Sequence, residues 1–190
     1  DGSTSRGFRR NYFSAHNAKK IDAICTKLKE WECNNEISDD MYYLLAASLV
    51  DGITKVSNTA GTYGAFLKID DPRKHKEIQL LPFEFFDNQR ENTSYCLDIA
   101  DVIHELQGDI LYLDPPYNTR QYPPYYHILE TAVLYDSPPI YGITGRRPYQ
   151  EKLSPFCMKD KAMPAMLDII ERARFPNIYI SYNTDGIMDY

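Results

Sequence analysis

Residues 109–117 read DILYLDPPY, and this stretch decides the fold. The five residues before Asp114 form a short, mostly apolar run, which predicts a buried strand. Pro115 and Pro116 end that strand, because proline lacks the N–H that a sheet ladder needs and fixes the backbone. Asp114 and the ring of Tyr117 are therefore expected at the carboxyl edge of an α/β sheet, where such folds bind ligands.

The second half of the chain alternates strands and helices around this stretch. Strands are predicted at 94–98, 109–113 and 177–182, and helices at 99–106, 125–135 and 159–173. Alternation of strand and helix is the connectivity of a parallel sheet with right-handed crossovers. We therefore predict an α/β fold with a mostly parallel sheet.

The first half reads as helical and mixed. Its predicted elements are a helix from Ser14 or Asn17 to about Cys33, a helix from Ser38 through Ile53, and short strands over 78–86 that are broken at Pro82. The polar stretch 87–93 follows these elements. We take it as the boundary between a first region, 1–93, and the sheet-containing domain, 94–190.

The composition is typical of a globular protein, with 43% hydrophobic and 25% charged residues. No apolar stretch is long enough to span a bilayer, and no signal peptide opens the chain. The four cysteines are scattered, so we expect neither a metal site nor disulfides, and we expect a cytoplasmic protein. The net charge of −6 argues against an obligate nucleic-acid binder, but basic residues cluster at 6–10, 73–76 and 146–147. Such clusters can meet phosphates or be solvated loops.

The turn at 114–117 suits the binding of a flat base that carries an amine. An exocyclic amine such as adenine N6 is a poor nucleophile, because its lone pair is delocalised into the ring. Hydrogen bonds to the Asp114 carboxylate and the Pro115 carbonyl would favour a pyramidal nitrogen and direct its lone pair at a methyl donor. Tyr117 would stack on the base, worth roughly 1–3 kcal/mol, after the base is flipped from a duplex. The alternative is an ordinary proline turn with a half-buried tyrosine.

Residues 111–131, LYLDPPYNTRQYPPYYHILET, resemble the catalytic region of N6-adenine-specific DNA methyltransferases of the alpha group, the DPPY-motif methylases of type II restriction-modification systems. Further matches are RNYFSAHNAKKIDAI at 10–24, KVSNTAGTYGAFLK at 55–68, GITGRR at 142–147 and ISYNTDG at 180–186. The resemblance follows the family's order along nearly the whole chain. It implies a partial Rossmann-like methyltransferase sheet, with a target-recognition region before it over 1–93.

The resemblance also implies roles for individual residues. Asp114, Pro115 and Tyr117 would bind and orient the target adenine, and Pro116 would shape the turn. Asp98 matches the position that binds the adenine amine of S-adenosylmethionine, with an exposed strand-end carboxylate as the alternative. The candidates for nucleic-acid contacts are Asn118, Arg120, Gln121, Arg146, Arg147, Asn183 and Asn58, the last with a packing turn as its alternative.

The implied function is methyl transfer from S-adenosylmethionine to the N6 amine of a flipped adenine in a specific double-stranded DNA sequence. Its setting would be a bacterial or phage cytoplasm, with a cognate restriction endonuclease as functional partner. The family's glycine-containing loop that cradles the cofactor is missing from this sequence, so we expect an inactive fragment of a longer enzyme. An RNA methyltransferase acting on a base amine and a non-catalytic nucleic-acid-binding module are the alternatives. The long region before the motif favours DNA.

Overall fold

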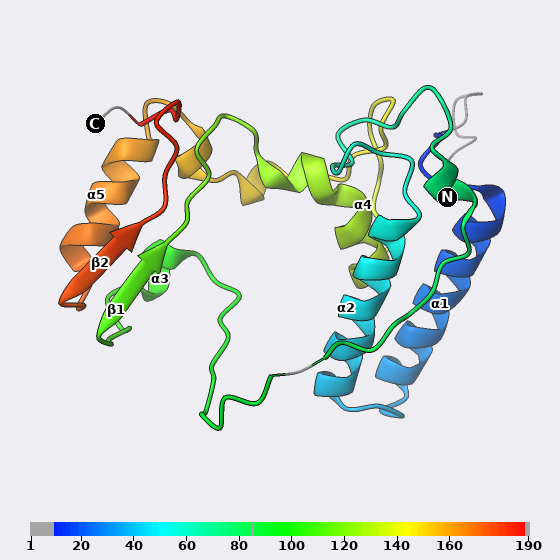
Figure 1. Cartoon of the computed structure of the whole chain (residues 1–190), viewed down its shortest axis with the longest axis horizontal. Coiled ribbons are helices and arrows are strands. Elements are labelled where there is room, and N and C mark those ends of the chain that lie inside the picture. Colours follow the sequence, from blue (N-terminus) through cyan, green and yellow to red (C-terminus); the bar gives the residue numbers. More distant parts are fainter. Residues whose placement is uncertain (1–9, 85, 189–190) are drawn as a thin grey trace. The chain divides into compact units, whose positions relative to one another are not determined.

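The computed structural model describes residues 10–84 and 86–188, and the chain divides into two compact units (Figure 1). The first unit is made of Asp1–Phe86 and Tyr122–Tyr149, and the second of Asp87–Gln121 and Gln150–Tyr190. The chain therefore leaves the first unit, enters the second, and passes through both again.

The first unit is helical. Its elements are α1 (Ala15–Cys33), α2 (Asp39–Lys55), the 3₁₀ turn η1 (Pro72–His75) and α4 (Tyr122–Leu134). Ser14 caps α1 by accepting a hydrogen bond from the Asn17 N–H at 3.1 Å, so the first of the two predicted caps is confirmed. Ser38 caps α2 as predicted. The prolines at the start of α4 are tolerated because first-turn N–H groups have no helical partner.

The core of the first unit lies between its three long helices. Buried residues of this core include Ile21, Cys25 and Leu28 from α1, and Leu49 and Ile53 from α2, with Ile128, Leu129 and Ala132 of α4 packed against them. The predicted boundary near residue 93 placed α4 with the sheet. The structure groups α4 with the helices instead, because its apolar side chains complete their core. Within the described residues, no helix is both long and apolar enough to cross a bilayer.

The second unit holds the parallel strands. Its elements are α3 (Ile99–Val102), β1 (Ile110–Leu113), η2 (Gln150–Lys152), η3 (Pro155–Cys157), α5 (Ala162–Arg172) and β2 (Asn177–Ile180). β1 and β2 pair in parallel, with Ile110 opposite Asn177 and Leu113 opposite Ile180, which confirms the predicted parallel pairing (Figure 1). The core is formed by Ile103, Leu113, Ala162, Met166, Ile169 and Met188.

The strands predicted over 78–86 and at 94–98 are wrong. The described residues of 78–86 form no strand: the Ile78 N–H donates to the Asn17 side chain at 3.2 Å, and Pro82 interrupts the segment. Residues 94–98 also form no strand, and their side chains are exposed. In both segments the backbone lacks a neighbouring strand among the described residues, and without a partner an apolar run does not become a sheet.

Candidate functional site

The turn at the end of β1 leaves its polar acceptors free. Leu113 is buried, whereas Asp114, the next residue, is exposed. Among the described residues, no hydrogen bond reaches the Asp114 carboxylate or the Pro115 carbonyl. Tyr117 is 47% exposed, and its carbonyl accepts a hydrogen bond from the Ile187 N–H at 3.0 Å. The turn is thus anchored through its backbone while a carboxylate, a carbonyl and a phenol ring remain available.

The end of β2 lies beside this turn. The Ser181 N–H donates to the Leu113 carbonyl at 2.8 Å, so the parallel pairing continues one residue past β2. Asn183 follows in an exposed turn, where its side-chain oxygen accepts a hydrogen bond from the Asp185 N–H at 2.9 Å. Because the carboxyl ends of parallel strands meet at one edge, the prediction that Asn183 comes from the adjacent strand end is confirmed. A role in the pocket stays a prediction.

Some residues after the turn bond to the protein's own backbone, and others have exposed side chains. The Asn118 side chain accepts a hydrogen bond from the Arg120 N–H at 2.9 Å. The Gln121 amide makes two bonds to the backbone of Ser154, at 2.8 and 2.9 Å. The carbonyl of Arg120 accepts a hydrogen bond from the thiol of Cys157, whose pKa is raised by burial. The Arg120 side chain itself is exposed.

Asp98 is exposed, but it does not end a strand. Its carboxylate caps α3 by accepting a hydrogen bond from the Ala100 N–H at 2.9 Å. Asp98 is exposed, as its alternative interpretation predicted, but residues 94–98 before it do not form the predicted strand. The described residues also contain no strand followed by a glycine loop and a helix, since β1 leads into the proline turn and β2 into the turn at 181–186. Asp98 is thus the one candidate cofactor contact that the sequence proposed, and its role stays a prediction.

The three candidates in the first unit differ sharply in exposure. Arg146 is exposed. Arg147 is buried, and its guanidinium forms an ion pair with Asp136 at 2.6 Å. Asn58 is fully buried, and the structure does not support the prediction that it contacts DNA. Of these three, Arg146 alone has an exposed side chain, and its contact with a phosphate stays a prediction.

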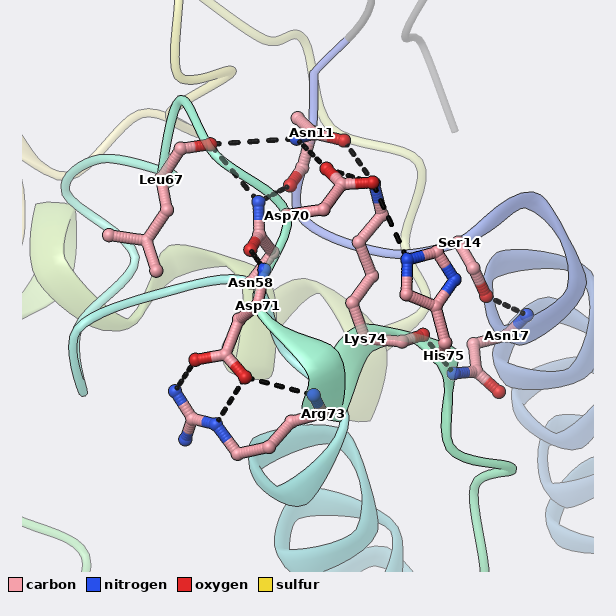
Figure 2. A network of polar contacts seen from close by, with 10 residues as sticks. All are labelled: Asn11, Ser14, Asn17, Asn58, Leu67, Asp70, Asp71, Arg73, Lys74 and His75. Carbon is pink, nitrogen blue, oxygen red and sulfur yellow. Dashed lines mark hydrogen bonds and ion pairs between the residues drawn. The ribbon is translucent and has the colours of Figure 1, made fainter.

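Asn58 belongs to a polar network that fixes the loop after α2 (Figure 2). Its amide donates to the carbonyls of Asn11 and Leu67, at 2.9 and 3.0 Å, and accepts a hydrogen bond from the Asp71 N–H at 2.8 Å. All its polar atoms are therefore engaged inside the protein. The structure therefore favours the packing turn that the sequence left as the alternative for Asn58, with partners up to 47 residues away in the chain.

The same network buries a lysine that the sequence grouped with possible phosphate contacts. Lys74 is 4% exposed, and its ammonium lies 2.9 Å from the Asp70 carboxylate and against the Asn11 side chain (Figure 2). Hydrogen bonds from Asn11 and Lys74 lower the pKa of Asp70 to about 2. Arg73 likewise binds Asp71, at 2.8 Å. These cations stabilise the loop through carboxylates of the same segment.

Comparison with known proteins assigns the chain to a family. The profile described as D12 class N6 adenine-specific DNA methyltransferase matches residues 3–184. The chain belongs to this family. The resemblance drawn from the DPPY motif and its flanking segments is therefore confirmed.

Curated relatives agree with this family. The chain is 42% identical over 182 residues to Type II methyltransferase M.NlaIII of Neisseria lactamica, which covers 96% of the chain and 54% of the relative. It is 41% identical over 182 residues to Type II methyltransferase M.FokI of Planomicrobium okeanokoites, covering 96% and 28%, and 39% identical over 178 residues to Modification methylase StsI of Streptococcus sanguinis, covering 94% and 27%. The chain thus spans between about a quarter and a half of these relatives. No solved structure matches it.

Proposed function

We propose that the protein of this chain transfers a methyl group to the N6 amine of an adenine in double-stranded DNA. The observation that carries the proposal is the free acceptor pair, Asp114 carboxylate and Pro115 carbonyl, beside the half-exposed ring of Tyr117. Family membership supports the chemistry. S-adenosylmethionine would supply the methyl group.

The chain's own residues bind and orient the base. The two N–H groups of the amine donate to Asp114 and to Pro115, which holds the nitrogen lone pair clear of the ring system. Tyr117 stacks on the face of the base, and Pro116 keeps the turn rigid. A base paired inside a duplex cannot reach such acceptors, so the adenine must be flipped out.

The outer contacts follow from exposure. Arg120 and Arg146 are the exposed cations that we assign to DNA phosphates, and Asn183 lies at the same sheet edge as Asp114. Asn118, Gln121 and Arg147 hold their loops in place through the internal bonds described above. Asp98 is proposed as a contact for the cofactor's adenine. A restriction endonuclease with the same target sequence would be the functional partner, and the protein would act in the cytoplasm.

The test is methyl transfer by the full-length protein from labelled cofactor to duplex DNA and to structured RNA. Asp114→Ala should lower kcat by about 100-fold or more, the usual effect of removing a group that stabilises the reacting centre. Asp109→Ala is the matched control, because this exposed aspartate precedes β1 at its other end. Both variants should unfold at the wild-type temperature.

Transfer to DNA that survives Asp114→Ala at a substantial fraction of the wild-type rate would remove the proposed role of the carboxylate. Transfer to RNA in place of DNA would favour the alternative substrate. Binding of DNA with no transfer by the wild-type protein would favour a non-catalytic module.

A further inference from the structure

Residues 141–146 form a tight hairpin in the first unit. Tyr141 and Arg146 exchange two backbone hydrogen bonds, at 2.8 and 2.9 Å, and the Gly145 N–H donates to the Gly142 carbonyl at 3.3 Å. Gly142 and Gly145 have φ values of +69° and +72°, which residues with a side chain rarely adopt. Two glycines therefore determine the path of the hairpin.

Three side chains from elsewhere in the unit bind the carbonyls of the hairpin tip. Arg10 donates to Ile143 at 3.0 Å and to Gly142 at 3.2 Å. The Tyr12 hydroxyl, whose shorter hydrogen bond goes to the Tyr63 carbonyl at 2.7 Å, lies 3.2 Å from the Thr144 carbonyl, and His127 Nε2 lies 3.0 Å from the same Thr144 oxygen. Arg10 also packs against Gly145, where an added Cβ would lie 2.7 Å from the arginine Nε. These contacts hold the backbone of the tip through its carbonyl groups.

The outward side of this tip carries apolar and cationic groups. Ile143 is 67% exposed, Tyr141 is 57% exposed, and Arg146 is exposed beside them. A single exposed isoleucine is ordinary on a protein surface. Here the carbonyls of Ile143 and its two neighbours accept hydrogen bonds from other parts of the unit, and the exposed residues Tyr141 and Arg146 pair at the base of the same hairpin. Such a surface is preorganised for contact with a ligand, which lowers the entropy lost on binding.

Positive charge gathers at the base of the hairpin, although the chain as a whole carries −6. Burial lowers the pKa of His127, the nearby charge of Arg146 lowers it further, the charge of Glu130 opposes this, and the charge of Arg147 adds to the lowering. Burial raises the pKa of Tyr12, an effect that Arg10 and Arg146 oppose. Three guanidinium groups therefore act on the buried groups behind the hairpin, with Asp136 paired to Arg147. The three guanidinium groups outnumber the carboxylates of Asp136 and Glu130, and the remaining positive charge favours a polyanion.

We propose that this hairpin enters a groove of the DNA, with Ile143 in apolar contact with base edges and Arg146 on an adjacent phosphate. The inference rests on the proposed function and adds to it a surface of the protein that contacts the bases of the DNA target. Apolar side chains in a groove contact thymine methyl groups or base steps, and so distinguish sequences. A phosphate contact fixes the register but carries no sequence information. Ile143 and Arg146 therefore have separable roles.

The experiment measures binding of the full-length protein to its target duplex and to a scrambled duplex at several salt concentrations. Ile143→Ala should weaken binding to the target roughly tenfold and leave scrambled DNA unchanged, as for loss of one base contact. Arg146→Ala should weaken both duplexes alike and reduce the salt slope by about 1. Ile69→Ala is the matched control, because this isoleucine is 84% exposed in the same unit. It should bind as the wild type does.

The results separate this inference from the proposed function. If Ile143→Ala binds both duplexes as the wild type does, or weakens both equally, the base contact is wrong, while loss of transfer in Asp114→Ala would still uphold the methyltransferase. If the wild-type protein neither binds nor methylates duplex DNA, both proposals fail. Because Ile143 is exposed, its variant should fold normally, which the melting temperature checks.

Discussion

Acidification should destabilise the helical unit through His127. The imidazole is 1% exposed, and its Nε2 lies 3.0 Å from the Thr144 carbonyl. A carbonyl only accepts hydrogen bonds, so Nε2 carries the proton of the neutral ring and Nδ1 holds a lone pair. Nδ1 is buried and has no hydrogen-bond partner among the described residues. Protonation would therefore place a charged donor where nothing accepts it.

The size and sign of the effect follow from the pKa. Burial, aided by Arg146 and Arg147 and opposed by Glu130, lowers the pKa of His127 from 6.5 to about 4. At about 1.4 kcal/mol per pKa unit, the difference between unfolded and folded states corresponds to about 3 kcal/mol. Between pH 6.5 and 4 the unfolded state binds the proton and the folded state does not, so stability rises with pH. The contribution is complete above pH 6.5 and is lost as the pH falls toward 4.

The assay compares the wild type with His127→Gln, whose amide can still donate to the Thr144 carbonyl but does not titrate. NMR titration of labelled histidine, assigned by the signal missing in the variant, should place the pKa of His127 near 4. Between pH 6.5 and 4 the free energy of unfolding should fall by about 3 kcal/mol more in the wild type than in the variant. A histidine that titrates near 6.5, or parallel pH profiles of the two proteins, would refute the reasoning.

Two further substitutions test the loops of the first unit. Gly145→Ala should lower DNA affinity, because Gly145 has a φ of +72° and an added Cβ would collide with Arg10. The hydrogen-exchange rates of the hairpin amides should also increase in this variant. Unchanged exchange rates would contradict the idea of a fixed tip. Asn58→Ala should lower the free energy of unfolding by about 3 kcal/mol, because it removes three hydrogen bonds of a fully buried amide, to the Asn11 and Leu67 carbonyls and from the Asp71 N–H. Denaturant titration measures this loss, and a loss of DNA affinity at full stability would restore a binding role.

The sequence predicted the elements whose signals are local. The apolar run before Asp114 and the two prolines after it define the end of β1, and Ser14 and Ser38 mark the starts of two helices. Parallel pairing followed from the alternation of strands and helices. The strand end and the helix starts depend on residues that are neighbours in the chain, and the parallel pairing depends on the order of the elements, so no particular tertiary contact was needed to predict them.

The candidate contacts were harder to predict because their roles depend on distant partners. Asn58, Gln121 and Arg147 are polar residues in loops. The sequence pattern of such a residue does not distinguish a contact with DNA from a hydrogen bond within its own loop. The structure assigns Gln121 to the Ser154 backbone and Arg147 to Asp136. These pairs have no signature in a single sequence. The failed strand at 78–86 has the same origin, since a distant asparagine binds its first N–H.

The proposed contact points share one arrangement: a backbone carbonyl is bound by another part of the same unit, while the side chain beside it stays exposed. At the proline turn, the Tyr117 carbonyl is bound by Ile187 while its ring stays exposed. At the hairpin, Arg10, Tyr12 and His127 bind the tip carbonyls while the Ile143 side chain stays exposed. A side chain on a fixed backbone loses little freedom on binding, so each anchor increases the affinity that its exposed neighbour can supply. Substituting an anchor should therefore weaken DNA binding without removing any contact to DNA.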